Sequence, residues 1–85
     1  MTDLEYDIFD ELYFVTSFEQ IQKELSIKEQ DLKDILLILI KKAWVRCFFS
    51  ATMDVVVEDE IDFEKNYQNY HYLATKEGLL MHNSR

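Results

Sequence analysis

The side chains with the greatest capacity for chemistry in this 85-residue chain are a run of carboxylates, two histidines and one cysteine. Asp59, Glu60 and Asp62 lack the ligand spacing and the glycine of a calcium-binding loop. His71 and His82 stand eleven residues apart, with no cysteine or second histidine beside either, which is not a zinc pattern. The sequence therefore predicts no metal site.

The single cysteine, Cys47, lies in the apolar and aromatic stretch 45–49. One cysteine forms no internal disulfide, and in such a stretch it is typical of a small buried hydrophobe. No nucleophile stands at a recognisable spacing from a base. We therefore expect a non-catalytic protein without a cofactor or a small-molecule substrate.

Composition predicts one folded domain spanning residues 1–85. Hydrophobic residues make up 48% and aromatic residues 14% of the chain, with one glycine and no proline, which is too apolar for a disordered tail.

The acidic N-terminus has no signal-peptide pattern. The longest apolar run, Ile35–Ile40, is six residues, far below the roughly 20 that span a bilayer. These features favour a cytoplasmic protein with no membrane contact.

Hydrophobic periodicity predicts an α+β domain. Apolar residues recur at helical spacing over residues 4–15, 18–25 and 28–42, and Ser17 with Gln20 fits a capping box for the second helix. Strand composition follows at 44–49 and 70–74. Between them, residues 55–57 suggest a second short strand or part of a long loop, and 65–69 suggest a loop. A short helix over 79–82 closes the chain, so the fold is a three-helix core with a small antiparallel hairpin.

The stretch from Phe18 to Val45 resembles a helix-turn-helix. Its apolar positions let two short helices cross over a shared core; they are Ile21, Leu25, Ile27, Leu32, Leu36 and Leu39. Lys41–Val45 resembles the end of a recognition helix that leads into a wing strand, and Tyr72–Gly78 resembles the last wing strand with its Thr-x-x-Gly exit. The chain thus resembles a winged-helix domain of bacterial transcription regulators. It departs from that pattern at Ser26 and Ala43, where the family often has glycine.

The resemblance implies that the third helix enters the DNA major groove. The implied DNA contacts are Lys28, Gln30, Lys33, Lys41, Lys42 and Arg46. The other interpretation of these residues is a solvated helix face with mixed charges, whose last lysines suit the helix dipole.

The predicted wing is acidic, which is unusual for a surface that lies along phosphates. Its carboxylates are Asp54, Glu58, Asp59, Glu60, Asp62 and Glu64, and they contribute −6 to a net charge of −8. Residues 1–11 contribute −5, residues 12–53 contribute +1 and residues 65–85 contribute +2. Two interpretations remain open for the carboxylates: a hairpin edge kept soluble by charge, or an acidic docking surface for a basic partner.

Surplus apolar residues indicate an interface between protein chains. The candidates are Leu37, Ile38, Leu79, Leu80 and Met81. We therefore expect a non-catalytic regulatory module that acts through protein contacts, as a homodimer or with a protein partner. The alternative is a DNA-binding transcription regulator whose dimer places two third helices about 34 Å apart.

Overall fold

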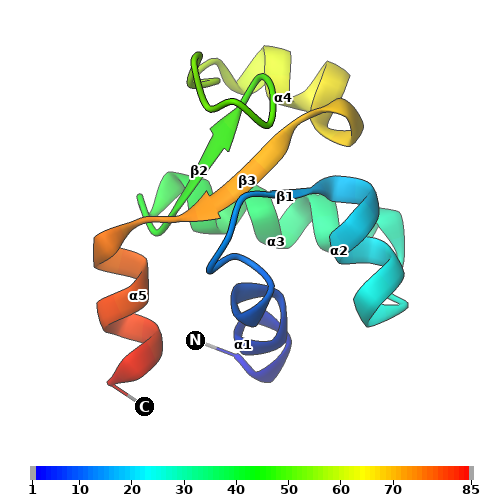
Figure 1. Ribbon diagram of the computed structural model, residues 1–85. Helices are drawn as coiled ribbons and strands as arrows, with labels where there is room; N and C mark the ends of the chain where they lie inside the picture. Colours follow the sequence, from blue (N-terminus) through cyan, green and yellow to red (C-terminus); the bar gives the residue numbers. More distant parts are fainter. Residues whose placement is uncertain (1, 85) are drawn as a thin grey trace.

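The computed structural model describes residues 2–84, which form five α-helices and a three-stranded antiparallel sheet (Figure 1). The elements in chain order are α1 (Asp3–Asp10), β1 (Thr16–Ser17), α2 (Phe18–Leu25), α3 (Glu29–Lys41), β2 (Val45–Phe48), α4 (Glu60–Asn66), the 3₁₀ turn η1 (Tyr67–Asn69), β3 (His71–Ala74) and α5 (Lys76–Asn83). The α+β class predicted from periodicity is confirmed.

The sheet has the strand order β1-β3-β2, so β3 lies in the centre and β2 at an edge. Val45 pairs with Ala74 and Phe48 with His71 across β2 and β3. Thr16 and Ser17 pair with β3 on its other side. The sequence predicts no strand at residues 16–17, because a strand of two residues is too short to show a period of two.

Side chains that cap the helix ends fix where the helices begin. Thr2 and Glu5 form a reciprocal capping box at α1, and the Ser17 hydroxyl accepts the backbone N–H of Gln20 at α2, as predicted. The Gln20 side chain does not complete a second box, because it donates to Glu24. The predicted boundaries of α2 are confirmed.

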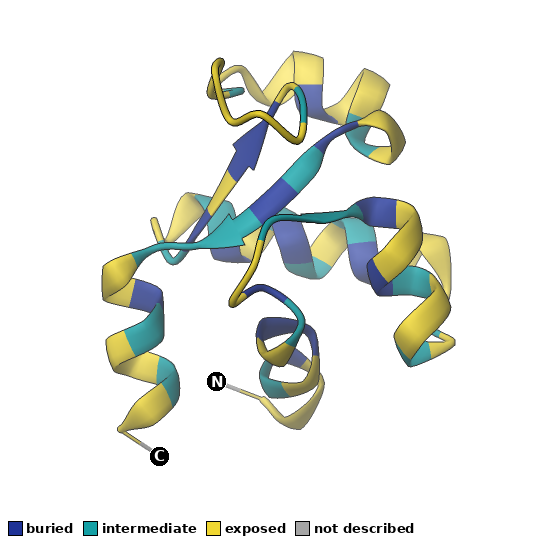
Figure 2. Ribbon diagram, viewed as in Figure 1, coloured by how far each residue is buried: buried dark blue, intermediate teal, exposed yellow. Residues whose placement is uncertain are grey.

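The core lies between the sheet and the inward faces of the helices, and Figure 2 shows the buried residues on these faces. Ile8, Phe9 and Leu12 are fully buried, as the helical spacing of the first segment predicts. Leu4 and Tyr13 are 38% and 45% exposed, so their predicted place on the buried face is wrong. Tyr13 lies outside the helix because α1 ends at Asp10 instead of continuing to residue 15, whereas Leu4 lies in the first turn of α1.

The two positions that depart from the glycine pattern both adopt left-handed backbone conformations. Ser26 ends α2 with φ 50°, and Ala43 follows α3 with φ 61°. Glycine adopts this region without the steric cost that a Cβ carries. Ser26 and Ala43 therefore adopt the backbone geometry that glycine usually provides at such turns.

The segment between β2 and β3 differs most from the expectation. Residues 55–57 form no strand: Val56 makes one isolated bridge with Phe48. Residues 65–69, expected as loop, contain the end of α4 and the 3₁₀ turn η1. Figure 1 shows α4 above the sheet, on the side away from α1 and α5. The segment is therefore a loop and a helix instead of a simple hairpin.

The Thr-x-x-Gly sequence begins α5 and holds it against the sheet. Thr75 Oγ1 accepts the Gly78 backbone N–H and donates to the carbonyl of Ala43. A Cβ on Gly78 would lie 2.2 Å from the Trp44 carbonyl oxygen and 2.5 Å from Phe9 Cζ. Only glycine allows this close approach. α5 extends over Lys76–Asn83, so the predicted range of 79–82 is too short, because the Thr75 cap starts the helix at Lys76.

His82 joins the far end of α5 to α1. Its Nδ1 lies 2.9 Å from the Tyr13 hydroxyl, and its ring stacks on Phe9 with centroids 5.2 Å apart. Its Nε2 lies 2.9 Å from Asp10 Oδ1, without the alignment of a hydrogen bond. The histidine therefore packs between two helices far apart in sequence.

Candidate interaction surfaces

Helix α4 lies against α3 and pairs with its lysines; we call the surface formed by these two helices the α3–α4 face. Lys33 Nζ lies 2.6 Å from Glu64 Oε2, and Lys41 Nζ lies 3.1 Å from Glu60 Oε1. The Tyr67 hydroxyl, just after α4, donates to Glu29 of α3. The acidic segment thus neutralises two of the lysines expected to contact DNA.

Lys33 is the most enclosed of these cations, since its side chain is 17% exposed. Its ammonium group also lies 5.3 Å from the centroid of the Tyr67 ring. The hydrogen bond from Lys33 to Glu64 raises the pKa of the ammonium above its ordinary value, and burial opposes this shift. Lys33 is therefore charged, and its ammonium group interacts with Glu64 and Tyr67 of the same chain.

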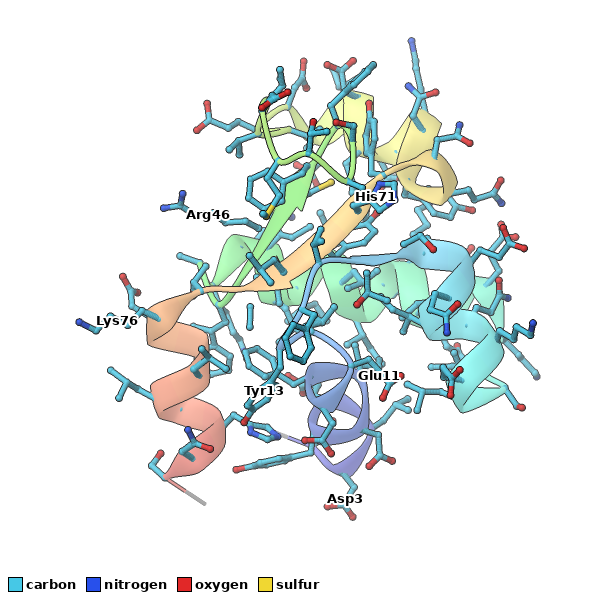
Figure 3. The ribbon with its side chains drawn as sticks, viewed as in Figure 1. Asp3, Glu11, Tyr13, Arg46, His71 and Lys76 are labelled. Atoms are coloured by element: carbon cyan, nitrogen blue, oxygen red, sulfur yellow. The ribbon has the colours of Figure 1, made fainter. Side chains whose placement is uncertain are left out.

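The remaining predicted DNA contacts do not share one surface. Lys28 is the exposed N-cap residue of α3, and the Gln30 amide donates to Asp34. Lys42 Nζ lies 4.7 Å from the centroid of the Trp44 ring, at the other end of the helix. Arg46 projects from β2, at the left of Figure 3. The structure therefore does not gather these six residues into a single basic patch.

The two segments that form the α3–α4 face carry a net negative charge. Residues 28–42 carry four lysines and three acids, while residues 59–65 carry four acids and one lysine. The combined charge is −2. Because phosphate contacts supply most of the affinity for duplex DNA, this face opposes a polyanion.

The six acidic candidates have different roles in the structure. Glu60 and Glu64 form the ion pairs with α3. Asp59 caps α4 by accepting the Ile61 backbone N–H, and Asp54 accepts the Thr52 hydroxyl. Glu58 and Asp62 are exposed. Only part of the predicted acidic surface is therefore available to another molecule.

The five apolar candidates also separate into two groups. Leu37 lines a hollow beside Phe63 of α4, and Leu79 packs against the core. Ile38 is 47% exposed on α3, while Leu80 and Met81 are 62% and 47% exposed on α5. The second group keeps the exposure that an interface between chains requires.

Sequence reasoning missed the aromatic residue that attaches α4 to the core. Phe63 is 3% exposed, and its ring contacts Tyr67 and Tyr72. In a helix this short, one buried aromatic leaves no repeating apolar stripe. The available signal was electrostatic: Asp59 at the N-cap, acids in the first turn and Lys65 in the last turn.

The Cys47 thiol is buried, and the Tyr67 hydroxyl is hydrogen-bonded to another side chain. Cys47 is 1% exposed, as its apolar surroundings predict, and burial raises the pKa of its thiol to about 12, although a hydrogen bond with Tyr72 lowers it. A hydrogen bond to Glu29 raises the pKa of Tyr67.

Among residues 2–84, no three His, Cys, Asp or Glu side chains cluster as metal ligands. No helix in this range has the length and apolarity to cross a membrane.

Comparison with known proteins adds no family to this description. No family model, curated protein or solved structure matches the chain.

Proposed function

We propose that this chain is a non-catalytic winged-helix module that acts through protein contacts. Support for the fold comes from the succession of helices α1 to α3 and the antiparallel pair β2 and β3. The helix-turn-helix resemblance of residues 18–45 agrees with this order. In the proposal, the segment between β2 and β3 replaces the usual basic wing with an acidic helix.

The observation that carries the proposal is the pairing of α3 with α4. Lys33 and Lys41 contact Glu64 and Glu60, so a DNA backbone would have to displace both carboxylates. Phe63 anchors α4 in the core, which makes that displacement costly. A partner without a strong negative charge is the better match for this face.

A DNA-binding test separates this proposal from the regulator alternative. We expect no saturable binding of a fluorescent 30-base-pair duplex to the unmodified chain at low ionic strength, measured by anisotropy. Tight, salt-sensitive binding would contradict the protein-contact proposal. It would favour a transcription regulator that reads DNA with α3.

Charge variants locate any DNA binding that is seen. The double variant Glu60→Gln/Glu64→Gln removes both ion pairs, and Glu58→Gln/Asp62→Asn removes the same charge from exposed positions. In our proposal, the two variants behave alike toward the duplex. Binding gained only by the first variant identifies α3 as a covered DNA surface and supports the alternative.

We further propose that the module is a homodimer that uses Ile38, Leu80 and Met81. These residues retain large exposed fractions in the single chain. Sedimentation equilibrium tests this: we expect a dimer at tens of micromolar, and a monomer in Leu80→Asp. A monomeric unmodified chain at that concentration removes the homodimer and leaves a different protein partner.

A further inference from the structure

A small hollow lies between α3, α4 and the loop that joins β2 to α4. It has a volume of about 230 Å³. Its apolar lining comes from all three segments; the residues include Leu37, Ile40, Val57 and Phe63. We call it the Leu37 hollow. Pockets that hold whole small-molecule ligands begin at about 300 Å³, so this hollow matches a single side chain better than a cofactor.

The fold holds the walls of the Leu37 hollow in place. The Val57 N–H donates to the Cys47 carbonyl at 2.8 Å, which fixes the loop against β2. Phe63 is 3% exposed and anchors α4 in the core. Because the walls form without a ligand, a side chain that enters the hollow does not have to order them.

Part of the apolar lining remains open to solvent. Leu37, Ile40 and Val57 are half-buried at the edge of the core. Leu37 and Ile40 lie three positions apart on α3, so they present one face to the hollow. The uncovered apolar surface favours an aliphatic side chain, because burial of both surfaces removes them from water.

The rim of the Leu37 hollow is acidic. Glu58, Asp59 and Glu60 follow one another at the end of the loop and the start of α4, and all three line the hollow. Glu60 pairs with Lys41, which also lines it, at 3.1 Å. Within residues 2–84, no cation forms an ion pair with Glu58 or Asp59. The rim therefore keeps two negative charges that no lysine or arginine of the described chain compensates.

We propose that the Leu37 hollow binds an aliphatic side chain from a basic segment of a protein partner. The aliphatic side chain lies against Leu37, Ile40 and Val57, and the basic residues on either side of it in the partner face Glu58 and Asp59. Opposite charges across such a contact select the partner and speed its approach. This inference rests on the proposed protein-contact function and names the charge of the partner.

Charge also argues against the other occupants of the hollow. A second copy of this chain has a net charge of −8, so the acidic rim repels it on approach. A polyanion such as DNA is repelled for the same reason. A basic segment is the occupant that the rim and the apolar lining favour together.

The test uses two blocked pentapeptides of equal charge, Arg-Lys-Leu-Lys-Arg and Arg-Lys-Ser-Lys-Arg. Each is titrated into the full ¹⁵N-labelled chain up to millimolar concentration while amide chemical shifts are recorded. We expect the leucine peptide to give saturable shifts at the Leu37, Ile40 and Val57 amides. The serine peptide should bind at least about tenfold more weakly, because it loses the buried aliphatic group. Absence of saturable shifts at these amides, or equal affinity for the two peptides, overturns the proposal.

Matched charge variants separate binding at the hollow from general attraction to an acidic protein. We expect Glu58→Gln/Asp59→Asn to weaken the leucine peptide by about fivefold. Asparagine at position 59 keeps an acceptor for the Ile61 N–H, so the cap of α4 remains. Asp54→Asn/Asp62→Asn removes the same charge from two residues outside the lining and should change the affinity less than about twofold. Equal weakening by both variants contradicts the proposal.

The occupant and the proposed function are tested separately. Shifts at Leu37 and Val57 that depend on protein concentration without peptide would identify a second copy as the occupant and overturn the assignment to a basic partner. Peptide binding at the hollow together with duplex DNA binding at α3 would overturn the function proposed for α3 and leave the hollow assignment in place. A chain that binds neither peptide nor duplex loses the hollow assignment and keeps the protein-contact function.

Discussion

Helices α4 and α5 are similar in length and flank the central strand β3 in the sequence, yet they attach to the protein in different ways. α5 approaches the backbone through Gly78, and His82 packs its far end against α1. α4 has one buried aromatic residue, Phe63, and ion pairs with α3. The position of α5 depends on close packing, whereas that of α4 depends on one anchor with charges around it.

Because of this difference, α4 can vary in its surface charge, whereas the packing of α5 constrains its sequence. The exposed residues of α4 can change in charge while Phe63 keeps the helix in place. At α5, the residue that faces the sheet has no room for a single methyl group. We therefore expect functional variation at α4 and structural constraint at the start of α5.

The largest effect is expected from Phe63→Ala, which removes the anchor of α4. Truncation of a buried phenylalanine leaves a cavity, so the free energy of unfolding should fall by about 4 kcal/mol. Urea denaturation measures this change. Ile61→Ala on the same helix is the control, since Ile61 is 63% exposed and should change stability by less than about 0.5 kcal/mol. Equal losses in the two variants would show that α4 has no single anchor.

Gly78→Ala tests the attachment of α5 and should cost about 3 kcal/mol, since the added methyl group meets the Trp44 backbone and the Phe9 ring. The measurement is again the urea midpoint. Lys76→Ala, at an exposed position in the first turn of the same helix, serves as the matched control. A stable Gly78→Ala variant would mean that α5 shifts freely, and α5 would then resemble α4.

The dependence of stability on alkaline pH tests how well the pair of strands β2 and β3 buries Cys47. The pKa of Cys47 rises from 9.0 to about 12 on folding, so the unfolded chain loses this proton first as the pH increases. Stability is therefore complete below pH 9 and falls between pH 9 and 12, by about 1.4 kcal/mol at pH 10 from this thiol.

Thermal unfolding of the unmodified chain and of Cys47→Ala at pH 8 and pH 10 measures the contribution of the thiol. The unmodified chain should lose more stability than the variant over this interval. Identical losses would show that the thiol already ionises in the folded protein. Cys47 would then lie in a more hydrated sheet than the structure shows.

His82→Gln should produce the smallest effect, a loss of about 1 kcal/mol. The variant loses the contacts of His82 with Tyr13 and Phe9, while the glycine contact that fixes the start of α5 remains. Chemical denaturation measures the loss, and a double-mutant cycle with Tyr13→Phe isolates the histidine–tyrosine term. Additive effects in this cycle would show that the two residues do not interact.

Much of the fold follows from local patterns. Ser17 was readable as a helix start because a capping side chain acts on a backbone N–H three residues away. The cap formed by Thr75 was not predicted, so the last helix was expected to begin at residue 79 instead of Lys76. The strands around Cys47 and Tyr72 were readable because aromatic and β-branched residues favour pleated surfaces. α4 was not readable as a helix, because its single buried residue produces no periodic signal.

The candidate surfaces were less accessible to sequence reasoning. The sequence identified the lysines of α3 and the acids of residues 54–64 correctly as charges, but it placed them on separate surfaces. Lys33 and Glu64 are 31 positions apart, and no local pattern indicates that they meet. The strand order β1-β3-β2 likewise joins segments far apart in the chain, which no local pattern indicates.

The sequence by itself determined the α+β class, the buried positions of the main helices and strands, and the uneven distribution of charge. These properties depend on side-chain size, polarity and spacing over a few residues. The tertiary structure decided which charges remain available, because α4 folds onto α3 and pairs with Lys33 and Lys41. It also decided that β3 is the central strand of the sheet, since backbone pairing depends on which segments meet in space.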